Sequence, residues 1–164
     1  MMSVKQPVMS YQKDDDYETP KYIWEMILNF VSREKTTYDP FYCRGKTTSV
    51  MKELGYECIH PDEDFFTNHH KYEYDIILSN PPFSIKKKIF DELKKIDKPF
   101  ILIVPVSTIT KKYFKDNFKN DDITIIIPKK RLQFMKNGEQ LKDCWFDTIF
   151  VCYKMNMNKQ MIYL

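Results

Sequence analysis

The sequence predicts an α/β fold, in which helices cover both faces of a mostly parallel central sheet with an antiparallel strand near the C-terminal end. Apolar runs alternate with amphipathic stretches, which is the order of crossover units in a parallel sheet. The runs YDIIL and FILIVPV are apolar throughout, as strands buried on both faces are. Near the C-terminus, KNGE predicts a turn before the alternating run CWFDTIFVCYKM, so a hairpin connection adds the antiparallel strand.

The N-terminal part is expected to begin with an arm and an amphipathic helix. Residues 1–16 are polar without periodicity, so we expect a mobile arm. In TPKYIWEMILNFVSR, residues 19–33, Thr19 suits the cap of a helix and Pro20 suits its first position. The next expected elements are a short strand in TTYDPFY, a helix in KTTSVMKELG that ends at Gly55, and a short strand in ECIH.

The C-terminal part continues the alternation. The strand YDIILSN precedes the helix IKKKIFDELKKI, for which Ser84 is the expected cap. The later elements are the strand FILIVPV, a helix in STITKKYFKDNF capped by Ser107 and Thr108, the strand ITIIIP, and RLQFM before the turn. A chain of 164 residues, 43% of them hydrophobic, suits one core, so we expect one domain over residues 17–157 and a tail over residues 158–164.

Composition limits the possible functions. Twenty-six Lys and Arg against 23 Asp and Glu give a net charge of +3, too small alone to indicate nucleic-acid binding. The four cysteines form no CxxC pair and lack a zinc-type spacing to the histidines, so we expect reduced thiols. The apolar runs are shorter than a membrane span, and no signal-type segment opens the chain. We therefore expect an intracellular protein, cytoplasmic or nuclear, with no membrane partner.

The first unusual strand end is DPFYCRG, residues 39–45. Parallel α/β sheets bind ligands outside the carboxyl ends of their strands. Asp39 can hold a cationic amine there, and Gly45 lets the backbone approach a ligand closely. An ordinary Asp-Pro turn with a glycine for its geometry explains the same residues, so both interpretations stay open.

The second unusual strand end is SNPPFS, residues 79–84. Pro81 and Pro82 remove two backbone donors and fix the backbone, so that carbonyl groups point in a set direction. Asn80 adds a side-chain acceptor, and Phe83 adds a flat ring. Two converging acceptors can hold both hydrogens of an exocyclic amino group, which predicts a site for a planar amine such as adenine. The alternative is a strand-stop signal followed by a core aromatic residue.

Together these motifs resemble those of AdoMet-dependent amino methyltransferases. DPFYCRG, then Asp64-Phe65-Phe66, then YDIILSNPPF is similar to the motif series of DNA adenine N6-methyltransferases of the NPPF, NPPY and DPPY type, especially small phage- or virus-like members. The resemblance runs from about Tyr17 to Tyr153. It implies a Rossmann-like class I methyltransferase fold, S-adenosyl-L-methionine (AdoMet) as cofactor, and methyl transfer to the N6 amino group of adenine in nucleic acid, with DNA favoured over RNA.

The resemblance also implies roles for individual residues. The catalytic residues, which would hold the target amine without a metal, are Asn80, Pro81, Pro82 and Phe83. The methionine part of AdoMet would lie against Asp39, Pro40, Phe41, Tyr42 and Gly45, with Asp39 facing the ammonium group. The rest of the cofactor site would comprise Tyr17, Thr19 and Pro20 closing over it, Asp64 and Phe65 at the adenine ring, Asp62 or Glu63 at the ribose, and Asn80.

The sequence departs from the family pattern at Cys43 and Arg44, where small or acidic residues are usual. A cation beside a sulfonium cofactor is unfavourable unless Arg44 turns outward. This departure favours one alternative, a catalytically inactive subunit of methyltransferase fold that binds nucleic acid or serves as a scaffold. The other alternative is an RNA adenine N6-methyltransferase, because the resemblance extends to RNA enzymes that also contain NPPF.

Two basic clusters are candidates for nucleic-acid binding. The first lies in the opening turn of the helix after NPPF, where the helix dipole disfavours cations and a phosphate backbone would compensate them; it comprises Lys86, Lys87 and Lys88. The second follows a later strand at the same sheet edge and comprises Lys129, Lys130 and Arg131. A solvated lysine-rich face explains the first cluster equally well.

The chain has no separate segment for recognising a target sequence. We therefore expect either low sequence specificity, or a homodimer or partner subunit that supplies the recognition.

The other notable side chains have a simpler interpretation. His69 and His70 lie in a polar loop, for which no metal or catalytic role is expected. Trp24 and Trp145 lie in apolar helix and strand patterns and are expected in the core.

Overall fold

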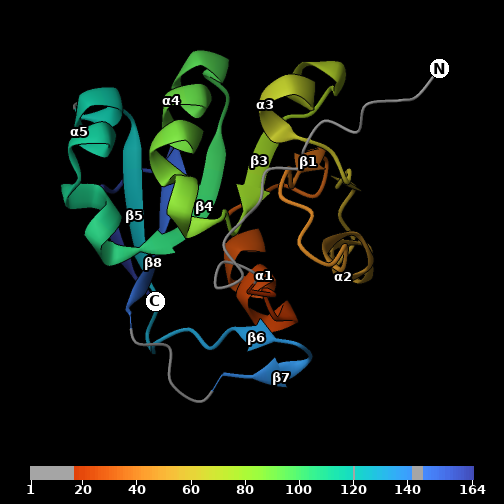
Figure 1. Ribbon diagram of the computed structural model, residues 1–164. Coiled ribbons are helices and arrows are strands. Elements are labelled where there is room, and N and C mark those ends of the chain that lie inside the picture. Colours follow the sequence, from red (N-terminus) through yellow and green to blue (C-terminus); the bar gives the residue numbers. More distant parts are fainter. Residues whose placement is uncertain (1–16, 120, 142–145) are drawn as a thin grey trace.

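The computed structural model describes residues 17–119, 121–141 and 146–164, and it has the α/β architecture that the sequence predicts (Figure 1). A seven-stranded sheet has the order β2-β1-β3-β4-β8-β5-β9, and β6 and β7 form a separate two-stranded sheet. The strands are β1 (Thr37–Tyr38), β2 (Cys58–Ile59), β3 (Ile76–Ser79), β4 (Phe100–Pro105), β5 (Ile123–Ile127), β6 (Met135–Lys136), β7 (Glu139–Gln140), β8 (Thr148–Tyr153) and β9 (Met161–Tyr163). The arm expected over residues 1–16 and Trp145 lie outside the described residues.

The first four strands along the sheet are parallel, which confirms the predicted crossover units. β1 lies between β2 and β3, and Tyr38 pairs with Ile59 on one side and Ile77 on the other. β3 and β4 are buried along their whole length, as continuous apolar strands covered on both faces are. Because these strands share one direction, the loops after β1, β2 and β3 all leave the sheet at its carboxyl edge.

β8 is the antiparallel strand, but its partners differ from the prediction. It lies inside the sheet and is antiparallel to both β4 and β5, with Val151 between Leu102 and Ile125. The turn at Asn137 and Gly138, both with positive φ, joins β6 to β7 instead. The predicted hairpin between RLQFM and the last long strand is therefore wrong. All six residues of β8 are buried, and an interior place between two strands covers such a run best.

The segment after β8 also differs from the prediction. Residues 158–164 were expected to form a tail, but β9 pairs with β5 in parallel, with Ile162 beside Ile126. The backbone N–H of Ile125 donates to the carbonyl of Gln160 at 2.8 Å, which continues this ladder. Two of the three residues of β9 are exposed, so the strand is held by backbone hydrogen bonds and lacks a strong apolar pattern in the sequence.

Helices cover both faces of the sheet, as predicted (Figure 1). Successive residues of β3 contribute to two different hydrophobic clusters, since Ile77 packs with Phe90 and Phe118 on one face, and Leu78 packs with Trp24 on the other. None of the helices in the described part of the chain has the length and apolar character needed to cross a membrane. The helices are α1 (Lys21–Leu28), α2 (Thr47–Glu53), α3 (Phe65–Asn68), α4 (Lys86–Ile96) and α5 (Lys112–Phe118).

Two helix starts differ from the predictions. A 3-10 turn, η3 (Phe83–Ile85), precedes α4, so Ile85 rather than Ser84 is the residue before this helix. The rigid Pro82 leads directly into that tight turn, and helical backbone angles begin at Lys86. α1 is shorter than the range 19–33, and the residue before it is Pro20 rather than Thr19.

The helix predicted over residues 107–118 is divided into two elements. The first is the 3-10 helix η4 (Val106–Thr110), and α5 follows after Lys111. Thr108 is buried inside η4, so neither Ser107 nor Thr108 caps α5, and the predicted cap is wrong.

Candidate functional site

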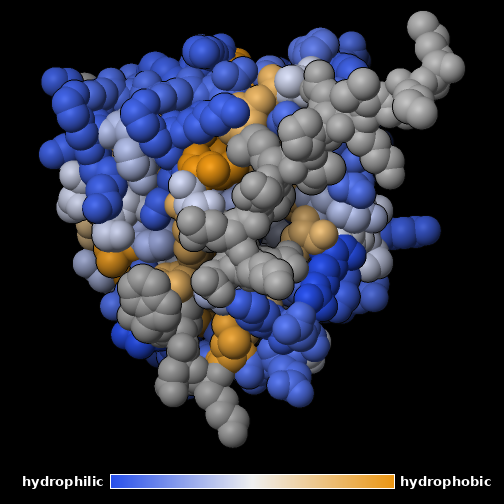
Figure 2. Space-filling view, viewed as in Figure 1, coloured by the Kyte–Doolittle hydropathy of each residue, from blue (hydrophilic) through white to orange (hydrophobic). Residues whose placement is uncertain are grey.

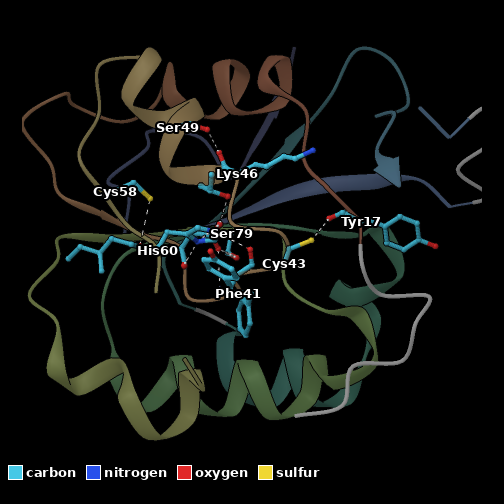
Figure 3. Close-up of polar contacts among 12 residues, drawn as sticks. Tyr17, Phe41, Cys43, Lys46, Ser49, Cys58, His60 and Ser79 are labelled. Carbon is cyan, nitrogen blue, oxygen red and sulfur yellow. Dashed lines mark hydrogen bonds and ion pairs between the residues drawn. The ribbon is translucent and has the colours of Figure 1, made fainter. Parts of the chain in front are cut away.

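The loops after β1 and β3 meet at the carboxyl edge of the sheet. Asp39 follows β1, and Asn80 follows β3, its parallel neighbour. The hydroxyl of Ser79 donates a 2.6 Å hydrogen bond to Asp39 Oδ1, which joins the two loops directly (Figure 3). The two unusual strand ends of the sequence therefore belong to one site.

Asp39 is the polar centre of this junction. It is 3% exposed. Oδ1 accepts from Ser79 and, at 3.4 Å, from the backbone N–H of Phe41; Oδ2 accepts from Thr47 Oγ1 at 2.8 Å and lies 3.4 Å from His60 Nδ1. Burial raises the pKa of Asp39, while the His60 ring, the two hydroxyls and the Phe41 amide oppose this rise because they favour the carboxylate. Asp39 thus connects the β1 loop with β3 and α2.

His60 is a site residue that the sequence did not reveal. Its side chain is 1% exposed. Nδ1 lies 2.8 Å from the carbonyl oxygen of Asp39, and Nε2 lies 3.0 Å from that of Tyr42 (Figure 3). Both ring nitrogens therefore lie within hydrogen-bonding distance of carbonyl oxygens of the β1 loop. His60 could have been predicted from its place directly after β2, because the loop there lies at the same sheet edge as the loops after β1 and β3.

A cavity of about 190 Å³ opens beside this junction. Seven of its lining residues are predicted cofactor-site residues: Tyr17, Thr19, Pro20, Asp39, Phe41, Tyr42 and Asn80. Two more, Cys43 and Arg44, are the residues at which the sequence departs from the motif that it resembles. The remaining lining residues were not predicted; they are Glu18, Lys21, Trp24, Lys46, Thr47, Val50 and Met135. Segments from α1, the β1 loop, α2, the β3 loop and β6 therefore surround one space.

Glu18 introduces a buried negative charge into the cavity wall. The residue is 8% exposed. Lys46 Nζ lies 2.7 Å from its Oε2, and Arg44 Nε lies 3.4 Å from its Oε1. Arg44 also donates to the side chain of Asn137 in the β6–β7 turn. The cation that departs from the family pattern is thus held by Glu18 and Asn137, which offsets its charge.

Gly45 allows the β1 loop to close tightly. Its φ is +70°, and a Cβ atom there would lie 2.4 Å from the hydroxyl oxygen of Tyr42. The ring of Tyr42 in turn stacks on His60, with centroids 5.1 Å apart. Glycine is therefore required both by the backbone conformation and by the ring of Tyr42.

The NPPF loop contributes Asn80 to the cavity wall and places the ring of Phe83 near that of Tyr17, another lining residue. Asn80 Oδ1 is buried and accepts no hydrogen bond from any described residue. Pro81 and Pro82 are buried, whereas Phe83 is partly exposed. The ring of Phe83 lies 6.5 Å from that of Tyr17 and 5.2 Å from that of Phe146, between centroids.

The residues expected at the adenine ring of AdoMet have other contacts. Asp64 caps α3, where its Oδ1 accepts from the backbone N–H of Phe66 at 2.9 Å. Phe65 is 2% exposed, and its ring packs against Phe41 at 5.3 Å. Phe65 therefore belongs to the core, and this structure does not present its face as a stacking surface. Asp62 is exposed in the loop before α3. These residues, like Pro40 and Gly45, are not among those that line the cavity.

The two basic clusters lie on the carboxyl edge, since β3 and β5 run in the same direction. In the first, Lys86 lies over the ring of Phe83 at 5.5 Å, Lys87 pairs with Asp91 at 2.7 Å, and Lys88 lies over the ring of Phe66 at 4.1 Å. The second comprises the exposed Lys129 and Lys130, together with Arg131, which pairs with Asp147 at 2.9 Å. Figure 2 shows hydrophilic side chains gathered over α4 and α5.

The chain is similar to one curated methyltransferase over a limited segment. It is 41% identical over 49 residues to the Type II methyltransferase M.EcoRI of Escherichia coli. That segment is 30% of this chain and 15% of M.EcoRI, so the match spans a small part of the relative. No family model matches the chain.

Three solved structures share a loose likeness of chain path. They are TrmN from Thermus thermophilus, a SAM-dependent O-methyltransferase from Thermotoga maritima and a precorrin-6y C5,15-methyltransferase from Geobacter metallireducens. In that order, the TM-scores are 0.43, 0.47 and 0.46, and the sequence identities are 11%, 10% and 10%. The likeness covers 81%, 93% and 88% of this chain, and 48%, 69% and 97% of theirs.

Proposed function

We propose that this protein transfers a methyl group from AdoMet to the N6 amino group of adenine in nucleic acid, DNA in preference to RNA. The observation that carries the proposal is the side chain of Asn80, which lines the cavity and whose buried Oδ1 accepts no hydrogen bond from the described residues. Leaving a buried acceptor without a donor costs about 1–3 kcal/mol. A bound amino group would satisfy it.

The residues around the cavity fit the methionine end of AdoMet. This end carries an ammonium and a carboxylate beside a sulfonium, and the wall offers both signs of charge through Glu18, Lys46 and Arg44. When bound, AdoMet would supply an electrophilic methyl group, which no side chain of the protein provides. The predicted residues that would hold it are Tyr17, Thr19, Pro20, Asp39, Phe41, Tyr42 and Asn80.

The chain's own residues would hold the amine rather than deprotonate it. Asn80 Oδ1 and the carbonyl of Pro81 would accept the two hydrogens of the amino group, and this directs the nitrogen lone pair away from the loop. Phe83 would pack on the base. With the amine and the methyl group aligned, positioning supplies much of the rate, and the proton can leave after transfer.

The nucleic acid would follow the carboxyl edge of the sheet. Lys86 at Phe83 and the pair Lys129 and Lys130 after β5 would contact phosphate groups. An extruded base would then reach the NPPF loop. Under this proposal a second copy or a partner subunit supplies target recognition. The similarity to M.EcoRI supports the methyl-transfer part, while the adenine target rests on the NPPF resemblance and on Asn80.

The test combines binding and transfer. S-adenosylhomocysteine is titrated calorimetrically into the wild type, and AdoMet with a tritiated methyl group is then supplied with unmethylated DNA or with RNA. Asn80→Ala should weaken cofactor affinity by no more than about tenfold, the loss of one contact, but lower transfer by at least about 100-fold. The control is Asn158→Ala, which changes an exposed amide and should leave both unchanged. Transfer to RNA alone would redirect the proposal to RNA, and cofactor binding without transfer to adenine in either would contradict it.

A further inference from the structure

Two carboxylates line the cavity, and they differ in how much hydrogen-bond acceptor capacity they have left for a ligand. Asp39 already has donors at both oxygens, from Ser79, Thr47, His60 and the backbone of Phe41. Accepting a ligand's ammonium would require Asp39 to give up contacts that hold the loops together. A carboxylate that is saturated in this way organises a site more readily than it binds a ligand.

Glu18 is the second carboxylate, and its Oε1 accepts no hydrogen bond from the described residues, although the atom is buried. The backbone fixes its place. Glu18 N–H donates to the carbonyl of Met135 at 2.7 Å, and Met135 N–H donates back at 3.0 Å. This bridge ties the segment before α1 to β6 beside the cavity. Glu18 is therefore a positioned carboxylate with acceptor capacity left.

The cations beside Glu18 make its surroundings suitable for a ligand of mixed charge. Lys46 contacts Oε2 and Arg44 approaches Oε1, which leaves the three side chains with one net positive charge. The side chain of Lys46 is 61% exposed, so it can turn toward a ligand without uncovering core surface.

We infer that Glu18, rather than Asp39, receives the ammonium group of an α-amino acid ligand in this cavity, and that Lys46 receives its carboxylate. The inference rests on the proposed function, because the amino acid is the methionine part of AdoMet. On binding, the ligand ammonium donates to Oε1 of Glu18, and Lys46 exchanges part of its contact with Oε2 for the ligand carboxylate. Both contacts are charge-assisted hydrogen bonds, which are among the stronger ones in proteins.

Three thioether ligands separate the two contacts. S-adenosylhomocysteine carries both the amine and the carboxylate, S-adenosyl-3-thiopropylamine keeps only the amine, and 5′-methylthioadenosine has neither. Glu18→Gln should weaken the binding of S-adenosylhomocysteine and of S-adenosyl-3-thiopropylamine by at least about tenfold and leave the affinity for 5′-methylthioadenosine unchanged. Lys46→Met should weaken the binding of S-adenosylhomocysteine only. Glu25→Gln, on the exposed side of α1, is the matched control and should change none. Calorimetric titration measures all the affinities, and thermal unfolding checks that each variant is folded.

The outcomes separate this inference from the proposed function. If the wild type binds S-adenosylhomocysteine and Glu18→Gln binds it equally well, the inference fails and the proposed function stands. Equal loss for all three ligands in Glu18→Gln would also overturn it, because the ammonium contact would then not be the cause. If the wild type binds none of the three, the proposed function fails and the inference fails with it.

Discussion

The ring of His60 is joined to Asp39 by two contacts, one to the backbone and one to the side chain. Its Nδ1 lies 2.8 Å from the Asp39 carbonyl oxygen and 3.4 Å from Oδ2. The other ring nitrogen reaches the carbonyl oxygen of Tyr42. A single side chain at the end of β2 thereby fixes the loop that follows β1 and contacts its buried carboxylate.

Removing this ring should destabilise the protein strongly. His60→Gln keeps at most one of the two carbonyl contacts and removes the ring beside the Asp39 carboxylate. Each buried polar group left without its hydrogen bond costs about 1–3 kcal/mol, so we expect a loss of about 3 kcal/mol in the free energy of unfolding. Urea titration at pH 7 measures it. His70→Gln changes an exposed histidine, and its free energy of unfolding should stay within about 0.5 kcal/mol of the wild-type value. A loss below about 1 kcal/mol for His60→Gln would contradict this structural role of the His60 ring.

Gly45 and Gly138 form a matched pair, since both have positive φ, +70° and +78°. A Cβ at Gly138 meets nothing within 4 Å, whereas at Gly45 it meets the ring of Tyr42. Gly138→Ala should therefore cost only the backbone strain, about 1 kcal/mol, and Gly45→Ala should cost about 1–2 kcal/mol more. Urea titration of both variants gives the difference, and equal losses would show that Tyr42 moves away without cost.

Local sequence patterns predicted the fold where neighbouring strands follow from crossover units. β3 and β4 are continuous apolar runs, and the helix α4 between them leaves little choice of pairing. β8 was predicted as an antiparallel strand but with the wrong neighbour, and β9 was not predicted, because their partners depend on contacts far along the chain. Ile125 pairs with Met161 across the whole of β8, and β9 itself lacks a strong apolar pattern. Similarly, the turn at Asn137 was predicted, but the short strand that follows it, β7, was not.

The sequence predicted the site residues that directly follow β1 and β3, but it did not predict most of the residues around them. The acid and amide that follow β1 and β3 stand out by their residue type, and they do come together. Glu18, Lys46 and His60 do not stand out in this way. Lys46 lies 28 positions from Glu18, and His60 lies 21 positions from Asp39. Ion pairs over such separations exist only once the sheet has brought the loops together.

The cysteines should differ sharply in reactivity. Burial raises the pKa of Cys58 and of Cys152 to about 12, and both thiols therefore stay protonated near neutral pH. Cys43 is exposed and lines the cavity. In a Cys144→Ser background at pH 7.5, N-ethylmaleimide should modify Cys43 and spare the other two, as read by mass spectrometry. Saturating S-adenosylhomocysteine should slow this labelling by at least about fivefold, if ligand occupies the cavity. Labelling of Cys152 in the folded protein would contradict its assigned burial.

Asp91 predicts a specific pH dependence of stability. Lys87 and Asn117 each donate to its carboxylate at 2.7 Å, and these bonds hold the pKa of Asp91 below its ordinary value of 3.8. The unfolded state then binds the proton more readily, so the stabilisation is present above about pH 4 and is lost as the pH falls through the folded-state pKa. Because the pair with Lys87 is exposed to solvent, its contribution is at most about 0.5 kcal/mol.

Asp91→Asn should therefore be slightly less stable than the wild type at pH 7, and the difference should vanish toward pH 2. Urea titrations at several pH values measure it. Asp62→Asn, which changes an exposed loop carboxylate, serves as the control. A difference between Asp91→Asn and the wild type that stayed constant down to pH 2 would contradict an electrostatic origin.

Phe83 offers the sharpest test of target binding, because its ring is partly exposed beside Asn80. Stacking of a base on an aromatic side chain contributes about 1–3 kcal/mol, so Phe83→Ala should raise the KM for DNA about 5- to 150-fold. Phe83→Tyr keeps the ring, so its KM for DNA should stay close to the wild-type value. Phe66→Ala is the matched control, since Phe66 is also partly exposed with a lysine over its ring, and should leave the KM unchanged. Steady-state transfer assays with DNA supply the values. A similar rise in KM for both alanine variants would indicate a general loss of packing and would contradict stacking at Phe83.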